Sequence, residues 1–92
     1  MRKYKILAID DEIGFTDAIK EYFAPLNDFE VMTAARGQIG LDIIRGEKPD
    51  IVLLDLKMPD MEGDEVLRRL KEIHPHAKPI IITAYNDGKN CG

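Results

Sequence analysis

The sequence contains a single cysteine, no tryptophan and no long apolar run. The lone cysteine, Cys91, excludes an intrachain disulfide, and we expect its thiol to be exposed and inert. The longest apolar runs span about four residues, whereas a membrane span needs roughly 20, so we expect no transmembrane helix. The N-terminus also lacks the apolar stretch and small-residue cleavage site of a secretory signal. These absences together predict a cytoplasmic protein.

Positive charge is also scarce. The chain has 13 lysines and arginines but 17 aspartates and glutamates, which gives a net charge of −4. This sign disfavours attraction to nucleic acid and to anionic membranes. Apolar residues make up 45% of the chain and charged residues 33%, a balance that excludes disorder. Because single domains usually have about 100–150 residues, a chain of 92 residues has no room for a second domain.

Three short and uninterrupted apolar runs predict strands inside a parallel sheet. They cover residues 6–9, 51–54 and 80–82. Strands that are buried on both faces lose the alternation of apolar and polar residues that half-exposed strands show. A fourth run, residues 30–34, keeps some polar residues and is predicted to be an edge strand.

Between these strands, apolar residues recur at helical spacing. The first predicted helix presents Phe15, Ala18, Ile19, Tyr22 and Phe23, and Pro25 ends it. The second presents Ile39, Gly40, Ile43 and Ile44, and Gly46 closes it. The third follows Gly63 and presents Val66, Leu67, Leu70 and Ile73.

Strands that alternate with helices predict a doubly wound α/β fold with a parallel sheet. We expect this domain to cover residues 1–84, and residues 85–92 to form a polar tail. Sheets of this kind place their functional sites beyond the carboxyl ends of the strands. The residues at those ends therefore indicate the chemistry.

Acidic residues follow two of the predicted strands. Asp10 and Asp11 follow the first strand, Asp55 follows the third, and the hydroxyl residue Thr83 follows the fourth. Clustered carboxylates repel one another, and a divalent cation would neutralise them; a ligand set of oxygens alone favours Mg²⁺. Such a site suits phosphoryl transfer, with an aspartate as the nucleophile. In the alternative interpretation, Asp10 and Asp11 only cap the first helix and Asp55 only ends a strand.

Three segments resemble the receiver domain of two-component response regulators: residues 9–12, 53–63 and 80–85. The resemblance covers about residues 4–87. It implies a flavodoxin-like (CheY-like) doubly wound sheet with the strand order 2-1-3-4. It also implies that Asp55 accepts a phosphoryl group from a phosphohistidine on a sensor histidine kinase or a histidine phosphotransfer protein. The chain would then be a phosphoacceptor in a phosphorelay, with at most self-directed phosphotransfer and autodephosphorylation as activity.

The same resemblance implies roles for the other site residues. Asp11, Asp55 and the backbone carbonyl of Lys57 would coordinate Mg²⁺, and Asp10 would hold the ion through water. Thr83 would donate a hydrogen bond from its hydroxyl group to a phosphoryl oxygen. The side chain of Lys57 lies where the family tunes the lifetime of the acyl phosphate.

The sequence departs from the family pattern because it ends soon after the fourth strand and has no fifth βα unit. We therefore expect the lysine that the family places after its fifth strand to be absent. We expect the strand at residues 80–82 to present an unpaired apolar edge, which predicts a homo-oligomer formed by edge pairing or by exchange of elements. The alternative function is a truncated receiver that acts only as a self-associating interaction module and cannot switch.

Two further interpretations receive less weight. A magnesium phosphatase with an aspartate nucleophile would resemble Asp-x-Asp after the first strand, whereas Leu56 and Lys57 follow Asp55. The second is a zinc site at His74 and His76. Because a zinc site needs three or four ligands, we expect these two histidines to lie in a solvated loop instead.

Overall fold

The computed structural model describes residues 3–56 and 58–82, and these residues form one parallel sheet with helices on both faces. The strands, in spatial order, are β2 (Phe29–Ala34), β1 (Tyr4–Ile9), β3 (Ile51–Asp55) and β4 (Lys78–Ile82). All three pairings are parallel. The predicted fold class and the strand order 2-1-3-4 are confirmed, and the polar run at residues 30–34 does form an edge strand.

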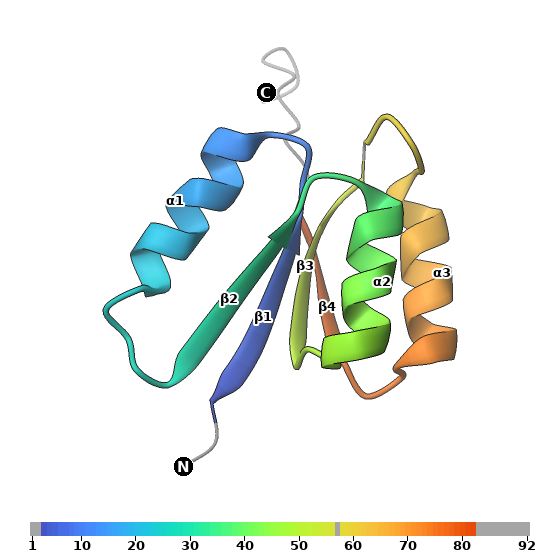
Figure 1. Ribbon diagram of the computed structural model, residues 1–92. Coiled ribbons are helices and arrows are strands. Elements are labelled where there is room, and N and C mark those ends of the chain that lie inside the picture. Colours follow the sequence, from blue (N-terminus) through green and yellow to red (C-terminus); the bar gives the residue numbers. More distant parts are fainter. Residues whose placement is uncertain (1–2, 57, 83–92) are drawn as a thin grey trace, which may run out of the picture.

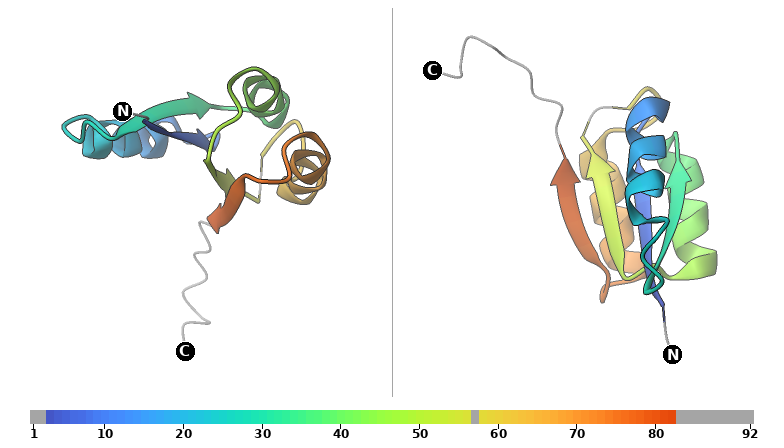
Figure 2. Two further views of the ribbon diagram at one scale, coloured as in Figure 1. Left: turned by 90° about the horizontal axis from the view of Figure 1, so that it is seen from below. Right: turned by 90° about the vertical axis from the view of Figure 1, so that its left-hand side faces the viewer.

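Three helices connect the strands: α1 (Ile13–Phe23), α2 (Gly37–Glu47) and α3 (Gly63–Ile73). Helix α1 packs mainly on β2 and β1, while α2 packs on β1 and β2 and α3 packs on β3. Figure 1 shows the order of these elements, and the views in Figure 2 show that α1 lies on one face of the sheet, whereas α2 and α3 lie side by side on the other. This is the doubly wound arrangement that the alternation of strands and helices predicts.

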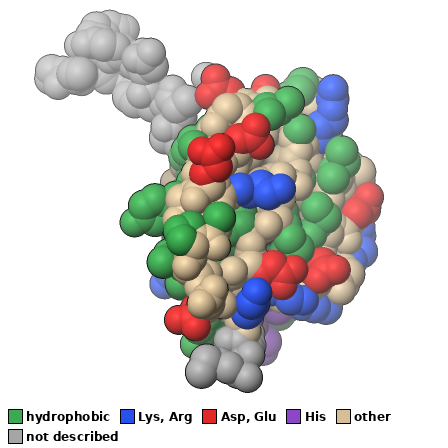
Figure 3. Space-filling view, turned by 60° about the vertical axis from the view of Figure 1, so that its left-hand side comes forward, with side chains coloured by type: hydrophobic (Ala, Val, Ile, Leu, Met, Phe, Trp, Pro, Cys, Tyr) green, Lys and Arg blue, Asp and Glu red, His purple; other side chains and the backbone are tan. Residues whose placement is uncertain are grey.

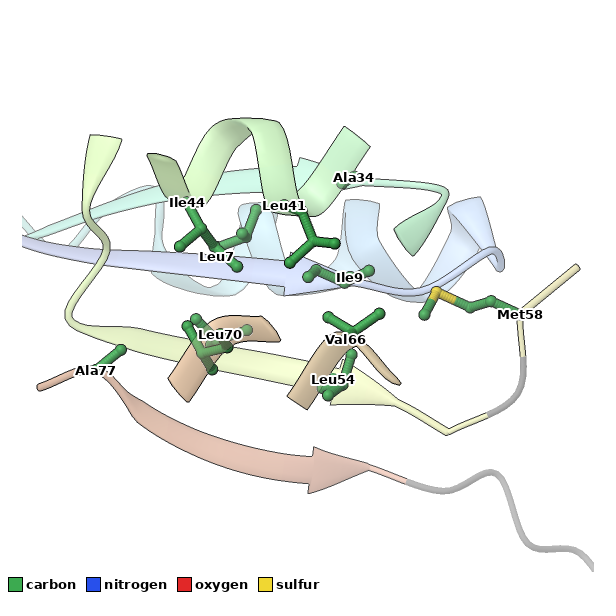
Figure 4. Packing of buried hydrophobic residues seen from close by; sticks show 11 residues of the cluster. Leu7, Ile9, Ala34, Leu41, Ile44, Leu54, Met58, Val66, Leu70 and Ala77 are labelled. Atoms are coloured by element: carbon green, nitrogen blue, oxygen red, sulfur yellow. The ribbon is translucent and has the colours of Figure 1, made fainter. Parts of the chain in front are cut away.

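The hydrophobic core lies between the sheet and the pair α2 and α3 (Figure 4). Its strand residues are aligned by register, because Leu7 pairs with Val52 and Ile9 with Leu54. All four side chains are fully buried. The helices contribute the other fully buried side chains of this cluster: Leu41, Ile44, Val66 and Leu70.

Helix α2 differs from the prediction at both its buried face and its end. Gly46 lies inside the helix, and Lys48, with a φ of 50°, forms the left-handed C-cap. Ile39 is 48% exposed, because the helix turns a face made of Gly37, Gly40, Leu41 and Ile44 toward the sheet. A Cβ atom on Gly40 would lie 2.4 Å from Ile9 Cδ1, so the glycine permits the close approach of α2 to β1.

The α1 face of the sheet is less completely covered. Thr16, 5% exposed, is the buried residue of α1, whereas Phe15, Ile19 and Phe23 are half-buried. Tyr22, predicted on the same apolar face, is 71% exposed. Figure 3, which brings this side of the molecule forward, shows hydrophobic side chains at the surface among acidic ones.

Of the two histidines that were predicted to lie in a solvated loop, only one is exposed. His74 is half-buried, and its Nε2 atom lies 2.9 Å from the backbone oxygen of Pro49, so it joins the end of α3 to the start of β3. His76 is exposed, as predicted. Cys91 and the tail at residues 85–92 lie outside the described residues. No helix in the described part of the chain is long and apolar enough to cross a membrane.

Candidate metal centre

Two neighbouring strands bring the three predicted aspartates together. Strands β1 and β3 are paired with Ile9 opposite Leu54, so the positions that follow, Asp10 and Asp55, are neighbours at the same end of the sheet. One carboxylate oxygen from each of Asp10, Asp11 and Asp55 lies within 4.8 Å of the others. Asp10 and Asp55 are each 8% exposed, and Asp11 is exposed. The cluster therefore has a buried floor and one ligand that faces solvent.

The electrostatics of this cluster favour a cation. The pKa of the Asp10 carboxyl is raised, first by its burial and then by the negative charges of Asp55 and Asp11. A hydrogen bond from the Glu12 backbone N–H to Asp10 Oδ1, 3.0 Å long, acts in the opposite direction. Because a bound cation would favour the ionised form of all three carboxyls, the arrangement fits a hard divalent ion with oxygen ligands.

Helix capping does not account for the acidic pair. Glu12 holds the N-cap position of α1, and its side chain makes no capping hydrogen bond. The Asp10 side chain instead accepts a hydrogen bond from the backbone N–H of Glu12, the N-cap residue itself, and caps no N–H group inside the helix. The alternative in which Asp10 and Asp11 serve as helix caps thus receives no support from the geometry.

A hollow of about 600 Å³ adjoins the cluster. Asp11 lines one side, and the loop between β3 and α3 lines the other; the remaining lining residues are Leu56, Met58, Pro59, Glu62 and Asp64. Gly63 closes this loop: its backbone N–H donates a hydrogen bond to the Leu56 oxygen at 3.0 Å. A Cβ atom there would lie 2.7 Å from Leu56 Cα, so a larger residue would displace backbone beside the site.

Sequence reasoning missed Asp60, which lies in this loop. Its carboxylate accepts hydrogen bonds from the backbone N–H groups of Gly37 (2.9 Å) and Gln38 (3.1 Å) at the start of α2. These two donors lower the pKa of the Asp60 carboxyl. No local pattern could reveal this contact, because the partners belong to a helix that is distant in the sequence. Lys57 and Thr83, the other predicted site residues, lie outside the described residues, and their roles stay predictions.

Comparisons with known proteins agree with this geometry. A family model described as the response regulator receiver domain matches residues 6–91. The chain is 41% identical over 87 residues to sporulation initiation phosphotransferase F of Bacillus subtilis (strain 168), an alignment that covers 95% of this chain and 69% of the relative. It is 36% identical over 84 residues to an uncharacterised transcriptional regulatory protein, YhcZ, of the same organism, covering 90% of this chain and 39% of that protein.

A solved structure shows the same fold. The CheY-like response regulator receiver domain protein from Methanospirillum hungatei JF-1 superposes with a TM-score of 0.84 at 34% identity, covering 97% of this chain and 70% of that chain. The match of the family model extends over the two strand ends that carry the acidic cluster and over the loop beside it. The chain therefore belongs to the family of response regulator receiver domains.

Proposed function

We propose that this receiver domain accepts a phosphoryl group on Asp55 in a reaction that requires Mg²⁺. The observation that carries the proposal is the convergence of Asp10, Asp11 and Asp55, with carboxylate oxygens within 4.8 Å of one another at the end of the sheet. Receiver domains are phosphoacceptors, and the family membership of the chain supports the same assignment. Asp55 would be the nucleophile, as the resemblance to the family implies; it ends β3 at the floor of the cluster, and Leu56, directly after it, lines the hollow beside Asp11.

The transfer exchanges one bond to phosphorus for another. The phosphorus–nitrogen bond of a phosphohistidine breaks, and a phosphorus–oxygen bond forms to a carboxylate oxygen of Asp55. The imidazole leaves with the electron pair of the broken bond and takes up a proton from solvent. Attack by water later returns the carboxylate and releases inorganic phosphate, which ends the signal.

The three aspartates would hold Mg²⁺, with Asp11, Asp55 and the backbone carbonyl of Lys57 as direct ligands and Asp10 as a ligand through water. When bound, the ion would neutralise negative charge on the phosphoryl oxygens. Asp10, with its raised pKa, would become fully ionised when the site is loaded. Thr83 would donate a hydrogen bond to a phosphoryl oxygen, and the Lys57 side chain would set the lifetime of the acyl phosphate.

The phosphoryl donor in this proposal is a histidine on another protein, either a sensor histidine kinase or a histidine phosphotransfer protein. The relative from Bacillus subtilis is named a phosphotransferase of sporulation initiation, which supports a place in a relay of phosphoryl groups. Asp11 is exposed and lines the open hollow, so a donor imidazole has access to the site from solvent.

The test uses a small phosphodonor, such as acetyl phosphate, with and without Mg²⁺. Intact-mass measurement should show one added phosphoryl group on the wild-type protein with Mg²⁺, and none on Asp55→Asn. Asp17→Asn, on the exposed side of α1, is the matched control and should be labelled like the wild type. A wild-type protein that gains no adduct with Mg²⁺ and excess donor refutes the proposal.

A second candidate function is self-association through β4, without transmission of a phosphorylation signal. The observation that favours it is the exposure of this strand: Ile80 and Ile81 are each 42% exposed. Within the described residues, β4 pairs with β3 and with no other strand. Sedimentation of the chain at tens of micromolar should reveal a dimer that Ile80→Lys converts to a monomer. A wild-type protein that sediments as a monomer contradicts this candidate.

A further inference from the structure

The hollow beside the aspartate cluster is lined by apolar and acidic side chains, and by no lysine or arginine among the described residues. Its acidic lining residues are Asp11, Glu62 and Asp64, and all three are exposed. Asp11 directly precedes the turn into α1, and the other two lie at the start of α3, which Figure 1 places at the same end of the sheet. A molecule that reaches the cluster through this hollow therefore passes three carboxylates.

Helix capping does not account for Glu62. This residue holds the N-cap position of α3, and its backbone oxygen accepts hydrogen bonds from Glu65 and Val66, but its side chain makes no capping hydrogen bond. Within the described residues, the Glu62 carboxylate also takes part in no ion pair. Its charge is therefore available to a molecule in the hollow.

The two acidic residues in the first turn of α3 have different surroundings. Both have the sign that favours a helix start. Glu65 forms ion pairs with Arg68 at 2.6 Å and with Arg69 at 2.7 Å, so its charge is compensated on the helix itself. Asp64 makes no ion pair in the part of the chain that the structure describes, and it lines the hollow. The charge that α3 presents at the hollow thus comes from Asp64.

These carboxylates set the charge that a phosphoryl donor meets. A magnesium ion on Asp10, Asp11 and Asp55 would compensate two of their three negative charges, and Glu62 and Asp64 add two more. A dianionic donor is repelled by this surplus, whereas a donor with a protonated nitrogen brings a positive charge next to its phosphoryl group and is repelled less.

We propose that Glu62 and Asp64 are specificity-determining residues, which make the site prefer phosphoryl donors with a protonated nitrogen leaving group to dianionic acyl phosphates. The inference rests on the proposed function, and phosphohistidine belongs to the preferred class because its leaving group is a nitrogen base. In either reaction a carboxylate oxygen of Asp55 forms a bond to phosphorus. Phosphoramidate loses its phosphorus–nitrogen bond, and ammonia leaves with the electron pair and takes up a proton from solvent. Acetyl phosphate loses a phosphorus–oxygen bond, and acetate leaves with the electron pair.

The test compares the initial rates at which phosphoramidate and acetyl phosphate label the protein, followed by intact mass at neutral pH, low ionic strength and saturating Mg²⁺. In Glu62→Gln with Asp64→Asn, the rate with acetyl phosphate divided by the rate with phosphoramidate should rise about fourfold, at about twofold for each carboxylate removed. A change in Mg²⁺ binding slows both donors alike and cancels in this ratio. Glu62→Gln alone keeps both acidic residues in the first turn of α3, and it should give the twofold rise if the double variant is unstable.

Salt provides a second measurement on the same proteins. The screening length falls from about 10 Å at 0.1 M salt to about 3 Å at 1 M, so added salt should raise the rate ratio of the wild type toward that of the double variant. The ratio of the double variant should change less. A wild-type ratio that does not respond to salt would overturn the proposal.

Glu21→Gln with Asp28→Asn is the matched control, because it removes the same charge from exposed positions at the opposite end of the sheet, in the last turn of α1 and just before β2. This variant should keep the wild-type rate ratio, and an equal rise in it would overturn the proposal. A wild-type protein that neither donor labels refutes the proposed function itself. Labelling by both donors, with an unchanged ratio in the variant of Glu62 and Asp64, refutes only the role of these two residues.

Discussion

The two faces of the sheet are built differently, and the candidate metal centre belongs to the less covered one. The face under α2 and α3 holds all fully buried residues of the core cluster, with Leu7, Ile9, Val52 and Leu54 aligned across two strands. The other face has α1 over β1 and β2, and there Phe15 and Ile19 stay half-buried. Strand alternation puts positions 10 and 55 on this second side, opposite to Ile9 and Leu54.

This division indicates that stability and chemistry are separated across the sheet. The closed face supplies the buried apolar area that holds the strands in register. The face with α1 carries the acidic residues, which under the proposed function need access to solvent, to Mg²⁺ and to a phosphoryl donor. Substitutions on the two faces should therefore change the free energy of unfolding by different amounts and in opposite directions.

The largest expected effect is a core truncation on the closed face. Leu41→Ala removes a fully buried side chain of α2 that packs in the core cluster. The free energy of unfolding should fall by about 2–5 kcal/mol, the usual range for a buried leucine. Urea unfolding followed by circular dichroism measures the change, and a loss below about 1 kcal/mol would argue against a core concentrated on this face.

Two glycines, one in α2 and one in α1, test the difference between the two faces by adding a side chain instead of shortening one. Gly40→Ala places a Cβ atom 2.4 Å from Ile9 Cδ1 and should lower the free energy of unfolding by about 1–3 kcal/mol, despite the helix preference of alanine. Gly14→Ala, in α1, has no atom within 4 Å of its new Cβ and should raise it by up to about 1 kcal/mol. Equal effects of the two substitutions, measured by urea unfolding, would remove the distinction between the faces.

Truncation on the α1 face should cost less than truncation on the closed face. Ile19→Ala shortens a side chain that is only half-buried, so we expect a loss of about 1 kcal/mol in the free energy of unfolding. Urea unfolding of this variant and of Leu41→Ala under one set of conditions gives the ratio of the two losses in the free energy of unfolding. A loss as large as that of Leu41→Ala would show that α1 seals its face as well as α2 does.

The same contrast explains how far the sequence alone could predict the structure. The uninterrupted run at residues 51–54 predicted an interior strand, and the aspartates after β1 and β3 predicted the cluster, because both signals are local and each has one geometric outcome. The buried face of α2 was predicted in part: Gly40 and Ile44 do face the sheet, but Gly37 and Leu41 complete that face in place of the predicted Ile39 and Ile43. Asp60 could not be predicted at all, because its partners belong to another helix.

The smallest expected effect comes from the acidic cluster. Removing a charge there should raise the free energy of unfolding, whereas the core truncations lower it. Burial and the charges of Asp55 and Asp11 raise the pKa of Asp10 above its ordinary value of 3.8. A carboxyl whose pKa is raised in the folded state stabilises the fold at low pH, and this contribution is lost as the pH rises through the raised pKa. Without divalent ions, the wild-type protein should therefore lose stability as the pH rises from about 4 toward neutrality because of this group.

Asp10→Asn removes one of the repelling charges and should stabilise the protein without metal at neutral pH. The expected gain is up to about 1 kcal/mol, the scale of a close pair of charges near a protein surface with the sign reversed. Added Mg²⁺ should stabilise the wild type and give little further stability to the variant, so the two unfolding curves should approach or cross as the ion is added. Thermal unfolding at pH 7 with and without Mg²⁺ measures both effects. A variant that is less stable than the wild type without the ion would show that Asp10 is held by contacts that outweigh the repulsion, and that the acidic side of the sheet also contributes to holding the fold together.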